Sequence, residues 1–266
     1  MKKFFFWLIA IVITLSSAVY QRLTGPTYPR RGKVMLADTV IKFELPRSEE
    51  ITKDGEIAVD VPDEEIQGRL LFKRFKTADP WTEVPLERKD SQVVGYLPKQ
   101  PMAGKLAYKV FLSDPGKEVS LTGEEPIIIR FKGHVPLTVL IFHVLVMFLA
   151  MLFSTSAGIA ALVRWDSARK LAIWTAALLF VGGFILGPLV QKFAFGSWWT
   201  GVPFGFDLTD NKTLIAMLGW VAAVIAGRGG KPARGWILAA SVLMLVVFMI
   251  PHSLFGSELK YTDLKR

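Results

Sequence analysis

Five apolar runs constrain this 266-residue chain more than any other feature of its sequence. They cover residues 4–20, 135–163, 171–190, 213–227 and 235–250. About 20 consecutive apolar residues form a helix long enough to cross a bilayer, and shorter runs lie at the low end of that range. We therefore predict five membrane spans. The first, residues 1–20, is either an uncleaved anchor or a signal peptide that is removed.

Three short segments beside these runs carry eight positive charges. They are Lys2-Lys3, residues 164–170 and residues 228–234. Segments rich in Lys and Arg stay in the cytoplasm, so the charges predict the orientation of every span. The expected protein lies in a bacterial inner membrane with a cytoplasmic N-terminus. Residues 21–134, the connection 191–212 and the tail 253–266 then lie in the periplasm.

The positive net charge of the chain comes mainly from the segments beside the predicted spans. The formal net charge is +9, yet residues 21–134 hold 19 Lys and Arg against 18 Asp and Glu. A nucleic-acid-binding protein would gather its positive charge on a soluble face, which argues against nucleic acid as a partner. The chain has no cysteine, which excludes disulfides, thiolate nucleophiles, iron–sulfur clusters and attached c-type haem.

Period-two alternation marks the stretch between the linker 21–33 and the second span. In residues 34–133 apolar side chains alternate with polar ones, as in one run where four share a face: Leu106, Tyr108, Val110 and Leu112. Such alternation predicts strands with one buried face. About seven short strands separated by turn signals favour a β-sandwich of the immunoglobulin or fibronectin type. Tyr108 near the start of a late strand suggests a tyrosine corner.

The connection 191–212 is rich in aromatic residues, and it precedes a fourth span of about 22 Å, short for a bilayer. One interpretation is an outward pocket or docking platform; its binding-surface candidates are Trp198, Trp199, Phe204, Asp207, Asp210 and Lys212. The other is an aromatic belt at the membrane interface, in which Thr209 or Asp210 caps the fourth helix.

Two histidines are candidates for holding a cofactor. His143 lies eight residues into the second span, and ionisable residues inside spans are functional candidates by default. Together with His252 it could ligate haem b or a metal, and Met147 and Met151 follow it on nearly the same face. The competing interpretation is an interhelical hydrogen bond made by His143.

Small residues in the third span predict close helix packing. Gly183 and Gly187 have the spacing that lets two helices approach, and Pro188 should kink the outer end. No nucleophile, phosphate-binding or metalloprotease motif is present.

These features predict a four-helix membrane domain at 134–252 joined to a periplasmic β domain. The expected function is non-enzymatic: an interaction or assembly subunit with a membrane or periplasmic protein partner. One alternative is a redox subunit that binds haem b or quinone through His143 and His252. Another is a small transporter or lipid-handling protein that uses the 193–212 loop.

Overall fold

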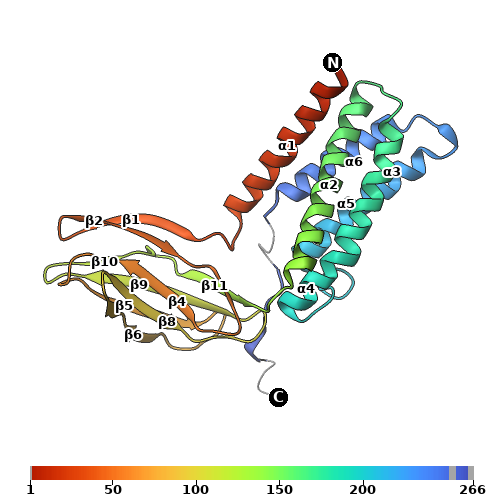
Figure 1. Ribbon diagram of the computed structural model, residues 1–266. Helices are drawn as coiled ribbons and strands as arrows, with labels where there is room; N and C mark the ends of the chain where they lie inside the picture. The colour runs from red at the N-terminus through yellow and green to blue at the C-terminus, as the bar shows by residue number, and fades with distance from the viewer. Residues whose placement is uncertain (1, 252–255, 263–266) are drawn as a thin grey trace. The chain divides into compact units, whose positions relative to one another are not determined.

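The computed structural model describes residues 2–251 and 256–262, and the chain divides into two compact units. The helical unit joins Met1–Pro26 to Val135–Ser257, whereas the β unit joins Thr27–His134 to the segment that begins at Glu258. Figure 1 shows that strands and helices occupy separate parts of the chain. A β region combined with several long apolar helices agrees with the sequence-based expectation.

The described part of the β unit contains eleven strands, whereas alternation predicted about seven. Three of them are only three residues long, too short to show a period of two. The strands are β1 (Arg30–Leu36), β2 (Thr39–Leu45), β3 (Ser48–Glu50), β4 (Gly55–Asp60), β5 (Gln67–Arg74), β6 (Thr82–Pro85), β7 (Glu87–Lys89), β8 (Gln92–Leu97), β9 (Lys105–Ser113), β10 (Glu118–Ser120) and β11 (Ile127–Lys132).

These strands form three sheets. A six-stranded sheet has the order β3-β11-β9-β5-β6, with β10 also paired to β9. A second sheet has the order β4-β8-β7, and β1 and β2 form a two-stranded hairpin. Every pair is antiparallel except β3 with β11, which is parallel.

One hydrophobic core joins the three sheets. The six-stranded sheet contributes the alternating face of β9, as the sequence predicted: Leu106, Tyr108, Val110 and Leu112 are all buried. Ile57 and Leu97 enter the same core from the three-stranded sheet, and Ile41 and Leu45 from the hairpin. Removal of apolar surface from water is the main stabilising contribution here, since the chain has no disulfides.

Tyr108 is buried, but it does not form the local corner that the sequence suggested. Its hydroxyl donates to the backbone oxygen of Pro46 at 2.7 Å, 62 residues away along the chain. A tyrosine corner instead closes on the backbone a few residues upstream. The bond here ties β9 to the segment after the hairpin, and burial raises the pKa of the Tyr108 phenol above its ordinary value.

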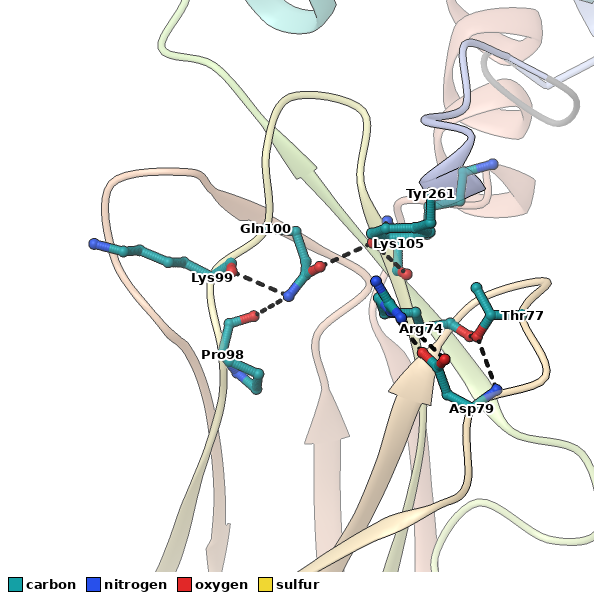
Figure 2. A network of polar contacts seen from close by, with 8 residues as sticks. All are labelled: Arg74, Thr77, Asp79, Pro98, Lys99, Gln100, Lys105 and Tyr261. Carbon is teal, nitrogen blue, oxygen red and sulfur yellow. Dashed lines mark hydrogen bonds and ion pairs between the residues drawn. The ribbon is translucent and has the colours of Figure 1, made fainter. Parts of the chain in front are cut away.

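The chain returns to the β unit after its last helix. We predicted 253–266 as a separate tail, yet its described part packs against the start of β9 (Figure 2). The Tyr261 hydroxyl accepts from the Lys105 amide at 3.0 Å and lies 2.9 Å from Gln100 Oε1. The Leu259 amide donates to the Ala103 carbonyl at 3.1 Å. Tyr261 is 7% exposed, so this residue is buried in the folded unit.

Charge also holds this segment. The Glu258 carboxylate accepts from Lys105 at 2.9 Å and from Lys76 at 3.1 Å. Burial lowers the pKa of Lys105, and the nearby charge of Arg130 lowers it further. Burial acts to raise the pKa of Glu258, but its hydrogen bonds to Lys105 and Lys76 outweigh this and leave the pKa below its ordinary value. The returning carboxylate therefore compensates a buried cation.

The described residues of the helical unit form six α-helices, one π-helical turn and one short 3-10 turn. Figure 1 shows α1, α2, α3, α4, α5 and α6 in chain order. Their bounds are α1 (Lys2–Thr24), α2 (Leu137–Leu162), α3 (Ala168–Phe180), the π-helical turn η1 (Val181–Leu186), α4 (Gly187–Phe195), α5 (Leu208–Ala226), the short 3-10 turn η2 (Arg228–Gly230) and α6 (Arg234–Met249).

Four helical stretches are long and apolar enough to cross a membrane: Phe4–Thr24, Leu137–Leu162, Ala168–Phe195 and Leu208–Ala226. The fifth predicted span, α6, is apolar but has 16 residues. The basic segment 228–234 covers η2 and the first residue of α6. The predicted third span is longer than expected, because α3, η1 and α4 continue one another.

Small residues allow the helices to pack closely. Helix α2 packs against α3 and α6, and α5 also packs against α3 and α6. A Cβ at Gly183 would lie 2.6 Å from Thr213 Cγ2, so this glycine is where η1 meets α5. At Gly158 of α2 the added atom would lie 2.4 Å from Ser241 Oγ of α6. Gly187 lies next to Pro188, and its amide donates to the Gly182 carbonyl in the π-helical turn.

Substitutions of Tyr261 test whether the C-terminal segment stabilises the β unit. Tyr261→Ala removes a buried ring and its hydroxyl, so we expect the β unit to lose about 3 kcal/mol of unfolding free energy. Tyr261→Phe should cost about 1 kcal/mol, because only the hydrogen bonds are lost. Hydrogen exchange of the β9 amides in the full chain measures both.

Tyr96→Ala serves as the control, since Tyr96 is 42% exposed on β8. We expect a change of no more than about 0.5 kcal/mol there. Equal effects at Tyr96 and Tyr261 would contradict the docking of the C-terminal segment.

Candidate functional site

The loop between α4 and α5, residues 196–207, is built around the carboxylate of Asp210. Its Oδ2 atom accepts from the amides of Thr200 at 2.6 Å and Gly201 at 3.0 Å. The side chain of Gln191 on α4 donates to the same oxygen at 3.2 Å. Asp210 is 6% exposed. A buried carboxylate needs such donors, and here they fold the loop back over the first turn of α5.

Asp207 is the N-cap of α5, which corrects the prediction that Thr209 or Asp210 has this role. Its Oδ1 atom accepts from the Thr209 amide at 2.7 Å, and its own backbone is not helical. The cap therefore satisfies an amide that has no partner within the helix. The other oxygen accepts from the amide of Ser257 at 2.6 Å and from its hydroxyl at 3.1 Å.

This cap also corrects the length of the fourth span. Because α5 begins at Leu208 rather than at residue 213, it has 19 residues and a length of about 28 Å. The start and the short length predicted for this span from the apolar run are therefore wrong. Asp210 and Lys212 belong to the helix and not to the loop.

Lys212 is 1% exposed and binds the end of α6. Its Nζ atom donates to the Ile250 carbonyl at 2.7 Å. The last carbonyls of a helix lack partners within it and carry partial negative charge, which a lysine compensates. Gln21 of α1 donates to the carbonyl oxygens of Phe248 and Ile250 at the same end. Three helices therefore meet through polar contacts at this end of the helical unit.

The aromatic residues of the loop separate into one that packs inward and three that face outward. Trp199 stacks on Phe184 with ring centroids 5.5 Å apart, and its indole donates to the Val202 carbonyl at 3.1 Å. Trp198 is 55% exposed, Phe204 81% and Phe206 90%. Phe206 was not among the sequence candidates, although it belongs to the same aromatic run.

The structure separates the six binding-surface candidates into exposed aromatic residues and buried ionisable residues. Trp198 and Phe204 lie on the surface, and Trp199 packs partly inward. The three ionisable candidates, Asp207, Asp210 and Lys212, are buried and hold the loop and the helix ends. The exposed side chains among these candidates are therefore aromatic, whereas the charged ones make hydrogen bonds inside the helical unit.

His143 lies between two cavities of the helical unit. Its Nδ1 atom is 3.0 Å from the Gly182 carbonyl of the π-helical turn. A carbonyl only accepts, so Nδ1 carries the hydrogen. A cavity of about 310 Å³ lies on one side, lined in part by Ser17 and Met151. A cavity of about 150 Å³, which also touches Asp207, lies on the other.

The haem or metal pair predicted from sequence cannot be assembled from the described residues. His252 lies outside them, and the described residues contain no group of three or more His, Asp or Glu arranged for a metal. Met147 and Met151 line the larger cavity together with His143. The contact that His143 makes is the interhelical hydrogen bond of the competing interpretation. His134 belongs to the β unit, with Nδ1 3.4 Å from Glu50 Oε1.

The loop's dependence on Asp210 can be tested by hydrogen exchange. Asp210→Ala leaves the amides of Thr200 and Gly201 without an acceptor, so their protection should fall by about tenfold or more. Asp166→Ala removes an exposed carboxylate from another loop and should leave both amides unchanged. Unaltered protection of Thr200 and Gly201 in Asp210→Ala would show that the carboxylate does not organise the loop.

Comparison of the chain with protein-family models, with curated proteins and with solved structures finds no match. Its role must therefore be inferred from its own residues and their geometry.

Proposed function

We propose that this chain is an integral protein of a bacterial inner membrane that acts as a non-enzymatic interaction or assembly subunit. In this proposal five helices span the membrane, the β unit is an immunoglobulin- or fibronectin-like sandwich in the periplasm, and the N-terminus is cytoplasmic. The single core shared by the two larger sheets supports a sandwich. The four long apolar helices support the membrane location.

The return of the chain to the β unit supports an even number of crossings after it. Residues up to His134 and from Glu258 belong to the same unit, so they lie on the same side of a membrane. Between them are three helical stretches long enough to span and α6, which is about 24 Å long. Four crossings satisfy this condition, and α1 makes a fifth. The basic segments at 164–170 and 228–234 then share the opposite, cytoplasmic side.

The observation that carries the interaction role is a preorganised loop with an exposed aromatic surface. Hydrogen bonds to Asp207 and Asp210 fix the loop, so little conformational entropy is lost when a partner binds. The surface it presents consists of Trp198, Phe204 and Phe206. Large aromatic side chains on a rigid frame are the usual centres of protein interfaces. In the proposed topology this loop lies on the same side as the β unit.

The polar groups of the helices favour this role over transport. His143, Asp210 and Lys212 are ionisable, and each has a hydrogen-bond partner among the described residues. Ion pathways and proton relays use ionisable groups that can exchange partners within a bundle. Here the two charged groups lie at a helix end, where they complete the fold.

A site-specific photocrosslinker distinguishes a protein-binding loop from an aromatic belt. We expect a benzophenone amino acid at Phe204 or Phe206 to capture a protein in intact cells, because these side chains face a partner. The same probe at Phe142, a 62% exposed residue of α2, should capture lipid alone. Lipid adducts alone at all three positions would reject the interaction role and leave the belt.

A further inference from the structure

The β1–β2 hairpin has one face in the core and one face open. Leu36, Ile41 and Leu45 are buried in the shared core. The opposite face consists of three cross-strand pairs, which are Arg31 with Glu44, Lys33 with Lys42, and Met35 with Val40. Alternation along each strand places all three pairs on the same side.

The middle pair sets two like charges opposite each other. Lys33 and Lys42 are both exposed, and the described residues contain no ion pair with either. Like charges directly across two strands destabilise a hairpin. The neighbouring Arg31 differs, because Glu44 binds it at 2.9 Å. The two lysines therefore lower the stability of the hairpin, and an external anion would relieve their repulsion.

The outer pair adds exposed apolar surface at the end of the hairpin. Met35 is 64% exposed and Val40 is 51% exposed. This apolar pair lies two positions from the exposed turn residues Ala37 and Asp38, and the lysine pair lies one open-face pair further from the turn. This order matches a membrane surface, where apolar side chains enter the acyl boundary and lysines remain at the phosphates.

Chain length keeps the hairpin close to a bilayer. Helix α1, long and apolar enough to span, ends at Thr24, and Lys33 follows nine residues later. Nine residues extend at most roughly 30 Å. The tether raises the local concentration of lipid headgroups around the hairpin, so a weak surface affinity is enough to keep it bound.

From these observations we propose that the open face of the β1–β2 hairpin docks on anionic lipid headgroups of the membrane that α1 spans. Lys33 and Lys42 bind the headgroup phosphates, and Met35 and Val40 enter the boundary below them. Docking orients the β unit at the membrane surface. It is independent of the aromatic loop and of any protein partner bound there.

The absence of cysteine from the natural chain allows a direct test. A nitroxide on Val40→Cys reports collisions with oxygen, which is lipid-soluble, and with a water-soluble nickel complex. The full chain is placed in nanodiscs of phosphatidylcholine, with or without phosphatidylglycerol. We expect the label to become accessible to oxygen and shielded from nickel only when phosphatidylglycerol is present, and high salt should reverse this. A label on Ser91→Cys, in an exposed turn, should stay accessible to nickel throughout.

Charge removal separates docking from a general effect of the lipid. Lys33→Gln with Lys42→Gln should lower the docked-to-undocked ratio roughly thirtyfold. The matched pair Lys99→Gln with Lys117→Gln, also exposed, should leave it unchanged. The proposal is overturned if the label on residue 40 is equally open to nickel with and without phosphatidylglycerol. It is also overturned if both reagents are excluded, because protein would then cover the face.

Discussion

The hydrogen bonds between the C-terminal segment and the start of β9 constrain the whole chain. Tyr261 and Glu258 bind Lys105 from a position about 155 residues further along, after every helix of the helical unit. A chain that leaves a folded unit and comes back to it must cross a membrane an even number of times. In the proposed topology, this parity puts the β unit and the C-terminal segment on the same side of the membrane. Which side that is follows from the basic segments, and the proposed number of spans from the lengths of the apolar helices.

Buried charge in this protein is used to close helix ends and loops. Asp207 caps α5, Asp210 collects loop amides, and Lys212 binds the end of α6. Each carries a desolvation cost that only complete hydrogen bonding offsets, which fixes one arrangement of the loop. The β unit follows the same pattern, because the Glu258 carboxylate binds the buried ammonium group of Lys105. Lys33 and Lys42 on the hairpin contrast with this pattern, because both are exposed and neither forms an ion pair within the described residues.

The sequence predicted well what depends on local periodicity. The buried face of β9 and the four apolar helices follow from repeats of two residues and from long apolar runs. The sequence-based predictions fail where contacts with residues far along the chain determine the structure. The start of α5 was placed too late because Asp210 and Lys212 resemble loop residues until their partners, the Thr200 amide and the Ile250 carbonyl, are known. The docking of Tyr261 left no sequence signal, since it lies in a polar tail far from Lys105. The sequence identifies the aromatic residues of the loop, but it does not show that Trp199 stacks on Phe184 whereas Trp198 is exposed.

Labelling of single cysteines from outside the cell tests the shared side of the β unit and the C-terminal segment most directly. Asp90→Cys lies in an exposed turn of the β unit, Lys260→Cys in the returning segment and Ser167→Cys in the first basic loop. A maleimide that cannot cross the membrane should label residues 90 and 260 in intact spheroplasts, and residue 167 only after permeabilisation. Labelling of residues 90 and 260 from opposite sides, or of residue 167 together with residue 90, would contradict this topology.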